Sequence, residues 1–442
     1  MVRRLSSLLA AGLACPPALA ADATAAVLGI PIEFVLFAVT LLGVALWHRH
    51  SLPIAVAGMV VISLYKIAFT GFHEGAGVAG WLAHLAHEWV VLANLLGLLL
   101  GFAILARHFE DSRLPHVLPR LLPGDWRGAF LLLAMVFVMS AFLDNIAAAL
   151  IGGTVAAHVF RRRVHIGYLA AIVAASNAGG SGSVVGDTTT TMMWIDGVAP
   201  MQLVHAYVAA ITALLVFGLV AARQQHALQP IVRETGTAAP LDWARLAIVV
   251  WILAAAIATN VAVNSLYPEL ADRFPFLGVA VWLAILLAIP LRRPEWRLLP
   301  DAAKGSVFLL SLVICASMMP VEHLPEASWL TALGLGFVSA VFDNIPLTAL
   351  ALAQGGYDWG VLAYAVGYGG SMIWFGSSAG VALSSLFPEA RSVVAWLKSG
   401  WHVALGYVVG FAVLLAALGW QPPPPHKPVR TAPATVAPTP PP

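Results

Sequence analysis

Three acidic residues, Asp144, Asp187 and Asp343, stand deep within apolar stretches of this sequence. If such stretches cross a lipid bilayer, an ionised carboxylate at their centre costs several kcal/mol unless a partner compensates its charge. The same stretches contain no Lys or Arg at comparable depth. The missing partner is therefore most simply a cation or a proton. The alternative is that each carboxylate only caps backbone N–H groups at a helix start, and a capping carboxylate can also bind an ion.

Neutral oxygen donors accompany the three acids, and hard monovalent cations prefer such oxygens to sulfur or imidazole. The threonines at 188–191 follow Asp187 directly, but successive helical residues point in different directions, so only one or two of them can face a site. We predict that the ion or the proton is bound by the following residues, with Asp144 and Asp343 as ligands of a monovalent cation: Asp144, Asn145, Asn177, Ser181, Asp187, Thr188, Thr189, Asp343, Asn344, Ser371 and Ser377.

Other kinds of chemistry find no support in the sequence. Cys15 and Cys315 lie far apart in apolar surroundings, which indicates neither a disulfide framework nor a cysteine metal site. No P-loop motif is present, so ATP-driven transport is not indicated. We expect no enzymatic activity, no cofactor and no nucleic-acid partner.

The composition shows what kind of solvent surrounds these residues. The chain has 442 residues, of which 60% are hydrophobic and 10% are charged, whereas about a quarter of the residues of a soluble domain are charged. So few charges cannot cover a soluble protein of this length. The lipid bilayer is therefore the predicted partner of most of its surface.

The two ends of the chain differ from the rest. Arg3 and Arg4 precede an apolar run at 8–13 and a small-residue cleavage site, which predicts a signal peptide over 1–20. The alternative is a frayed start to the first membrane helix. The stretch 421–442 is rich in Pro, Ala and Thr, which predicts a disordered tail.

A membrane-spanning helix needs about 20 apolar residues. Placing the mature N-terminus outside puts most Lys and Arg residues in cytoplasmic loops, as the positive-inside rule requires. The predicted location is a bacterial-type inner membrane, with both mature termini outside. Ordinary spans are predicted at about 31–47, 52–70, 88–106, 201–222, 244–262, 274–291, 304–320 and 400–419.

Two apolar regions do not look like ordinary spans. The region 128–160 carries Asp144-Asn145 at its middle and arginines at both ends, so both ends suit the cytoplasm. The region 328–356 carries Asp343-Asn344 and acidic flanks, so both ends suit the outside. These patterns predict two re-entrant hairpins that enter the membrane from opposite faces.

Two further regions are predicted to be interrupted spans. The regions 166–195 and 360–386 contain dense Gly and Ser at mid-depth, which favours unwound backbone lining a polar cavity.

These features occur in the same order twice. The segment from Ser140 to Ile146 aligns with Ser339 to Ile345, and Gly179-Gly180-Ser181 aligns with Gly369-Gly370-Ser371. The predicted fold is an all-α polytopic membrane protein with two inverted repeats. Each repeat contains three spans, a re-entrant hairpin, a broken span and a plain span. The predicted boundaries are 21–222 for the first repeat, 223–243 for a cytoplasmic linker and 244–420 for the second. Inverted repeats with broken helices are typical of secondary transporters, which work by alternating access.

At these motifs the chain resembles the NhaD-type sodium/proton antiporters of the ion transporter (citrate transporter-like/ArsB) superfamily. The resemblance rests on the two Asp-Asn segments, on 178–194 and on 369–380. It implies exchange of Na⁺ or Li⁺ for H⁺. It also implies an elevator-like movement of a hairpin-bearing domain in a homodimer. The chain departs from the family where Ala147, Ala148 and Ala149 replace the usual threonines after the first Asp-Asn, which puts the cation and its affinity in question.

The alternative function is cation-coupled transport of citrate or a related dicarboxylate. Such relatives typically carry Ser-Asn-Thr at the hairpin tips, where this chain has Asp in both copies. Two tip carboxylates would repel an anion, and no deep Arg is present to hold one. A channel or receptor is disfavoured because broken inverted repeats suit alternating access.

Cation/proton exchange at a shared site also requires a group that binds a proton at working pH. A free Asp titrates near 3.9, and burial beside other carboxylates raises that value. Each of the three acids is therefore a candidate for the proton site. Asp187 lacks an acidic counterpart, because Ser377 holds its place in the second half.

Overall fold

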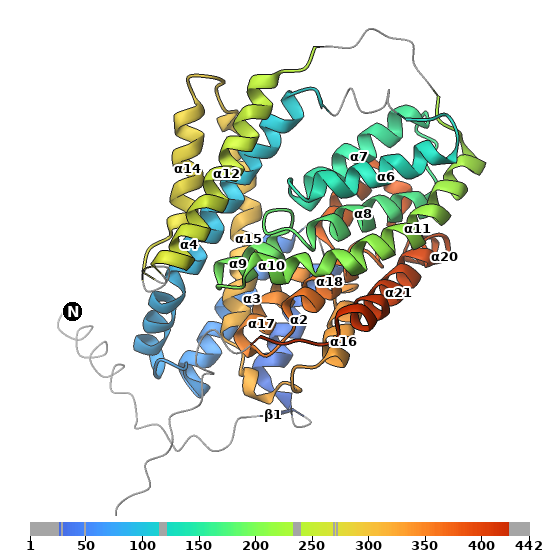
Figure 1. Cartoon of the computed structure of the whole chain (residues 1–442). Coiled ribbons are helices and arrows are strands. Elements are labelled where there is room, and N and C mark those ends of the chain that lie inside the picture. The colour runs from blue at the N-terminus through green and yellow to red at the C-terminus, as the bar shows by residue number, and fades with distance from the viewer. Residues whose placement is uncertain are drawn as a thin grey trace, which may run out of the picture.

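The computed structural model describes residues 26–27, 30–47, 50–114, 122–232, 240–267, 270 and 273–423. The predicted signal peptide and residues 424–442 of the predicted tail lie outside the described residues. Almost every described element is a helix; the one pair of strands in this part of the chain is β1–β2, in which Ala26 lies opposite Pro31. The protein is thus an all-α polytopic membrane protein (Figure 1).

The α-helices follow the same order in the two halves of the chain, and the short strands and turns differ. The first half contains β1 (Ala26–Val27), β2 (Ile30–Pro31), α2 (Ile32–Leu46), α3 (Ser51–Tyr65), the π-helical turn η2 (Lys66–Thr70), α4 (Gly77–Asp111), α6 (Trp126–Ser140), α7 (Asn145–Val159), α8 (Ile166–Gly180), α9 (Thr188–Ile195), α10 (Pro200–Val204) and α11 (Ala206–Leu228).

The second half repeats this order with a few short 3₁₀ turns. It contains α12 (Trp243–Leu266), α14 (Phe276–Ala288), η4 (Trp296–Leu298), α15 (Leu299–Ser317), η5 (Val321–His323), α16 (Trp329–Ser339), α17 (Asn344–Gln354), α18 (Trp359–Gly369), α19 (Ser378–Leu386), η6 (Pro388–Arg391), α20 (Val393–Ser399) and α21 (Trp401–Leu418).

Five helical segments in the described part of the chain are long and apolar enough to cross a membrane: 51–70, 77–111, 200–228, 296–317 and 401–418. The predicted spans 31–47, 244–262 and 274–291 contain helices with shorter apolar segments. The helix α4 begins well before the predicted span at 88–106. It can do so because the buried His84 is paired: its Nδ1 lies 3.1 Å from Glu74 Oε2, and its Nε2 lies 3.0 Å from Ser317 Oγ.

Polar residues directly before the first helical residue cap several helices. Asp125 accepts a hydrogen bond from the second residue of α6, and Asp242 does the same for α12. Asp358 accepts two backbone N–H bonds at the start of α18. Ser328 and Thr331 form a capping box at the start of α16. Such caps satisfy backbone donors that a helix leaves unpaired.

The helices pack as two groups (Figure 1). The six-helix group consists of α2, α3, α4, α12, α14 and α15, and the hairpin group consists of α6 to α11 and α16 to α21. Within the hairpin group, α11 packs along α21, α6 along α8, and α16 along α18. The two groups meet where α15 packs against α17 and where α4 contacts α9.

Hydrogen bonds from three tyrosines connect α16, α18 and α21. The Tyr368 hydroxyl donates to the Val403 carbonyl at 2.8 Å, and the Tyr407 hydroxyl donates to the Leu333 carbonyl at 2.9 Å. Tyr364 donates to two carbonyls of α21, and the three rings stack on one another. Each buried phenol thus has a partner, as buried polar groups require.

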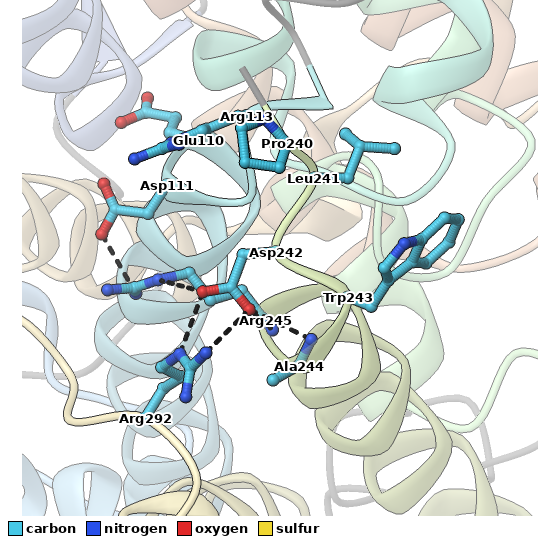
Figure 2. Close-up of a pocket in the computed structure, with 10 residues that line it drawn as sticks. All are labelled: Glu110, Asp111, Arg113, Pro240, Leu241, Asp242, Trp243, Ala244, Arg245 and Arg292. Carbon is cyan, nitrogen blue, oxygen red and sulfur yellow. Dashed lines mark hydrogen bonds and ion pairs between the residues drawn. The ribbon is translucent and has the colours of Figure 1, made fainter. Parts of the chain in front are cut away.

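Paired charges gather at one end of the six-helix group (Figure 2). Arg245 bonds Asp111 at 3.0 Å, and Arg292 bonds Asp242 at 2.9 Å. The hydrogen bond from Arg292 holds the pKa of Asp242 below its ordinary value. An open pocket of about 800 Å³ is lined by these residues. Its charges pair with one another, so we regard it as a structural charge network. Lys66 in η2 donates to the carbonyl of Met318, directly after α15, at 2.7 Å.

Candidate ion-binding site

Each half of the chain contains a helix pair that is separated by a short non-helical break. The four helix ends at these two breaks form the candidate site. In the first half α8 ends at Gly180 and α9 starts at Thr188; in the second half α18 ends at Gly369 and α19 starts at Ser378. The backbone folds back tightly in both breaks. A Cβ on Gly180 would lie 2.7 Å from the Gly186 carbonyl oxygen, and a Cβ on Gly370 would lie 2.7 Å from that of Gly376. Glycine is therefore required at both places.

The helices before each break are held against the preceding arm in the same way. Ser140 in α6 donates to the Ser176 carbonyl at 2.5 Å, and Ser339 in α16 donates to the Val366 carbonyl at 2.8 Å. Gly179 and Gly369 allow the two backbones to approach closely, since a Cβ on either would lie about 2 Å from the carbonyl oxygen of the facing arm. These contacts set the position of each break relative to the nearby Asp-Asn pair.

Each of the three acids lies directly before the first residue of a helix. Asp187 Oδ1 accepts the Thr189 N–H at 3.1 Å, and Asp343 Oδ1 accepts the Ile345 N–H at 3.1 Å. The second oxygen of Asp343 accepts a bond from the Ser378 hydroxyl at 2.9 Å. Asp144 stands at the equivalent position before α7 and is half-buried. Capping therefore does occur at Asp187 and Asp343, and it uses one oxygen of each carboxylate.

Asn177 connects the two halves of the chain. Its side-chain Nδ2 donates to Ser371 Oγ at 2.9 Å and to Ser377 Oγ at 3.1 Å, both in the second break. Its Oδ1 accepts a bond from Asn145 Nδ2 at 3.0 Å. The first Asp-Asn pair is thus linked through one amide to the break of the other half.

Asp187 receives the matching contact from the second half. Asn344 Nδ2 lies 3.4 Å from Asp187 Oδ2. Asp187 is 2% exposed and close enough to Asp144 and Asp343 to interact electrostatically with both. In the described part of the chain no Lys or Arg pairs with any of the three acids. The site therefore concentrates negative charge that its own side chains do not neutralise.

Most of the predicted site residues lie where the two broken helices meet, which we call the crossing. Their hydrogen bonds differ. Ser181 donates to the Ala178 carbonyl of its own helix. Thr190 and Thr191 donate to carbonyls of the preceding break and of Asp187, so they close the loop. Thr189 is fully buried beside Asp187, and Thr188 is half-buried at the start of α9.

The predicted set leaves out two residues at this crossing. Ser378, which the sequence places among the neutral oxygen donors near the acids, donates to Asp343. Gly367 faces the Asp187 carboxylate. The signal for it was the alignment of the halves, because Gly367 stands two residues before Gly369 just as Asn177 stands two residues before Gly179.

The described residues contain no cluster of three or more His, Cys, Asp and Glu side chains able to hold a metal ion. Besides the carboxylates, the polar groups in contact at the crossing are the amides of Asn177 and Asn344 and the hydroxyls of Ser371 and Ser377. Hydroxyl and amide oxygens beside carboxylates are the kind of ligand that hard monovalent cations prefer.

No protein-family model matches the chain. The chain is similar to sodium/proton antiporter 1 of Arabidopsis thaliana, with 26% identity over 326 residues, 64% of this chain and 54% of the relative. It is also similar to sodium/proton antiporter 2 of the same plant, with 24% identity over 286 residues, 57% of this chain and 67% of the relative. The chain thus spans about half to two thirds of these relatives. This membrane protein is therefore similar to two proteins that are named sodium/proton antiporter.

Proposed function

We propose that this chain exchanges Na⁺ or Li⁺ for H⁺ across a membrane by alternating access. One observation carries the proposal: Asp187 is almost fully buried at the crossing of two broken helices, beside the Thr189 side chain and the Asn344 amide, and no cationic side chain of the described residues pairs with it. A buried carboxylate in this position is stable only when a cation or a proton neutralises it. The names of the two similar proteins support the same activity.

The chemistry of exchange follows from that single charge. When Na⁺ is bound, the carboxylate is compensated and needs no proton. When Na⁺ leaves, the same burial that made the cation necessary favours uptake of a proton. A carrier of this kind moves across the membrane only in a neutralised form, loaded with one ion or the other. Exchange, and not uniport, is the result.

Two inverted repeats account for how the site reaches both sides. The α-helices follow the same order in the two halves, and the serine and glycine contacts of α6 with α8 match those of α16 with α18. We infer that α6–α7 and α16–α17 are re-entrant hairpins that enter from the cytoplasmic and the outer face, respectively. The basic ends of α4 and α12 mark the cytoplasmic side in this proposal.

The two hairpins differ in one respect that suits alternating access. The second arm α17 packs on α15 of the six-helix group, where Ile345 and Leu350 meet Leu312 and Val313 in one apolar cluster. The first arm α7 packs on α6, α8 and α19, with no comparable packing on α4. Phe142 at the first tip is 56% exposed. We infer that this is a state closed to the outside and open to the cytoplasm.

That inference predicts which hairpin tip is accessible. In a Cys315→Ser background, we expect a cysteine at Ile146 to react with a membrane-impermeant maleimide from the cytoplasmic side several times faster than a cysteine at Ile345. The reason is that Ile146 is half-buried, whereas Ile345 is 4% exposed against α15. The measurement is labelling rate in oriented vesicles. Equal rates at the two positions, or labelling of Ile146→Cys from the outside alone, would contradict the proposed state.

Transport in proteoliposomes tests the activity itself. We expect Na⁺ and Li⁺ to dissipate an imposed proton gradient, with K⁺ much weaker, and labelled citrate not to enter. The control is the double variant Asp144→Asn with Asp343→Asn in the same lipid. Sodium-dependent citrate uptake without cation-induced proton movement would replace the antiporter with a cation-coupled carboxylate carrier. For location, we propose a bacterial-type inner membrane with both mature termini outside, and a homodimer as the assembly.

A further inference from the structure

Three consecutive arginines form the turn between α7 and α8, away from the proposed ion site. Arg161, Arg162 and Arg163 are all exposed. In the part of the chain that the structure describes, none of the three forms an ion pair with a carboxylate. The turn at 161–163 thus presents three unpaired positive charges at the surface.

The backbone of this turn favours glycine, although the sequence has arginine there. The Arg161 N–H donates to the His158 carbonyl at 3.2 Å. The Arg162 N–H donates to the Ala157 carbonyl at 2.7 Å, which completes the hydrogen bonds of a Schellman motif at the end of α7. Arg161 and Arg162 have φ values of 51° and 58°, where a side chain adds strain that glycine avoids. The turn therefore retains charge at two positions where its own stability favours glycine.

The start of α6 lies at the same end of the hairpin group as this turn. Residues that follow α11 contact both: the Val232 N–H donates to the Val159 carbonyl at 2.9 Å, and a Cβ on Gly128 would lie 2.7 Å from the Ile231 side chain. The apolar helices α6 and α7 therefore begin and end side by side, so the turn lies where their apolar surface stops.

A tryptophan marks the membrane–water boundary at this end. The guanidinium group of Arg223 lies 5.3 Å from the centroid of the Trp126 ring, and that of Arg127 lies 5.9 Å from it. Tryptophan is enriched at the level of the lipid headgroups. Arg127 has a carboxylate nearby, Asp125, at 3.9 Å. The turn at 161–163, at the same end of the group, has no such partner among the described residues.

We propose that the arginine turn at 161–163 binds the phosphate groups of anionic lipids at the membrane surface. A guanidinium group binds phosphate oxygens through parallel N–H bonds, and a basic segment beside an apolar region attracts anionic headgroups. In the proposed orientation the turn faces the cytoplasmic leaflet. The inference concerns lipid binding alone, so it does not depend on the exchange of Na⁺ or Li⁺ for H⁺.

The test uses the full chain in neutral detergent and measures the rise in melting temperature when phosphatidylglycerol is added. Phosphatidylcholine is the reference lipid without net charge, and we expect it to stabilise the protein much less. The double variant Arg161→Gly with Arg162→Gly removes two charges and keeps a turn that glycine adopts without strain. It should need about 25-fold more phosphatidylglycerol for the same rise, at about fivefold for each basic residue. Arg163→Gln should need about fivefold more.

Two further variants separate charge from backbone geometry. Arg161→Lys with Arg162→Lys keeps both charges at the same strained positions, and its requirement should stay within about threefold of the wild-type value. Arg113→Gly is the matched control: Arg113 also has a positive φ, 64°, but it lines the pocket that contains Glu110 and Asp111 (Figure 2). This variant should respond to phosphatidylglycerol like the wild-type protein.

Three results would overturn the proposal. The first is a wild-type response to phosphatidylglycerol in the double glycine variant. The second is a loss in the double lysine variant as large as that in the double glycine variant, since charge would then not be what binds the lipid. The third is equal stabilisation by inorganic phosphate, which would indicate a site for a free anion and not for a lipid surface.

Discussion

Asp187→Asn is expected to lower Na⁺-induced proton movement by about 100-fold, because a buried ionic contribution of about 3 kcal/mol corresponds to that factor. The substitution keeps the shape of the residue. The Asn side-chain oxygen can still accept the Thr189 N–H that Asp187 now accepts. The variant thus removes the charge and retains the cap. The measurement is proton movement in proteoliposomes at several pH values, each with added Na⁺.

Asp196→Asn provides a control for this experiment, since it removes a carboxylate just after α9 and away from the break. We expect that variant to exchange like the wild-type protein. If Asp187→Asn exchanged Na⁺ at the wild-type rate and with the wild-type pH dependence, its carboxylate would serve α9 only as a cap, and the observation that carries the proposed function would be lost.

The second large effect is expected at the hairpin tips. Asp144→Asn and Asp343→Asn should each abolish exchange, because each acid contributes charge close to Asp187 and each begins the arm that follows the tip. Asn is again a good cap, so the bond from Ile345 N–H at the second tip can persist. Loss of exchange in a correctly folded variant would therefore report the charge.

Two comparisons make the test of the tips decisive. Ser378→Ala removes only the hydroxyl that bonds Asp343, and we expect a partial loss of exchange, smaller than that of Asp343→Asn. Normal melting temperatures must accompany each loss. Wild-type exchange in both tip variants would show that the two carboxylates are only helix caps, and the proposed mechanism would then be wrong.

Much of the helical order could be predicted from the sequence because composition sets it. Arginines on both sides of 128–160 and the Asp-Asn pair at its centre predicted two arms, and the structure has α6 and α7 meeting at Asp144. Glycine and serine at 176–183 and 367–371 predicted two broken helices, and the breaks lie at 181–187 and 370–377. The inverted relation of the halves stays a prediction, as do the roles of the site residues.

The contacts of individual side chains could not be predicted in the same way. Nothing in the threonine run at 188–191 indicated that Thr190 and Thr191 close a loop while Thr189 lies against the Asp187 carboxylate, because this depends on the path of the break. The partners of His84 in α4 could not be predicted either, because one of them, Ser317, lies far along the chain.

The tyrosines that join α16, α18 and α21 have a mechanical consequence. Separating these helices would leave buried phenols and carbonyls without partners, which costs free energy at every bond. The contact of α17 with α15, by contrast, is made of aliphatic side chains that lose little when one surface slides over the other. In the proposed exchange, hydrogen bonds would therefore keep α16, α18 and α21 together as one unit, and the aliphatic contact between α15 and α17 is where that unit could slide against the six-helix group.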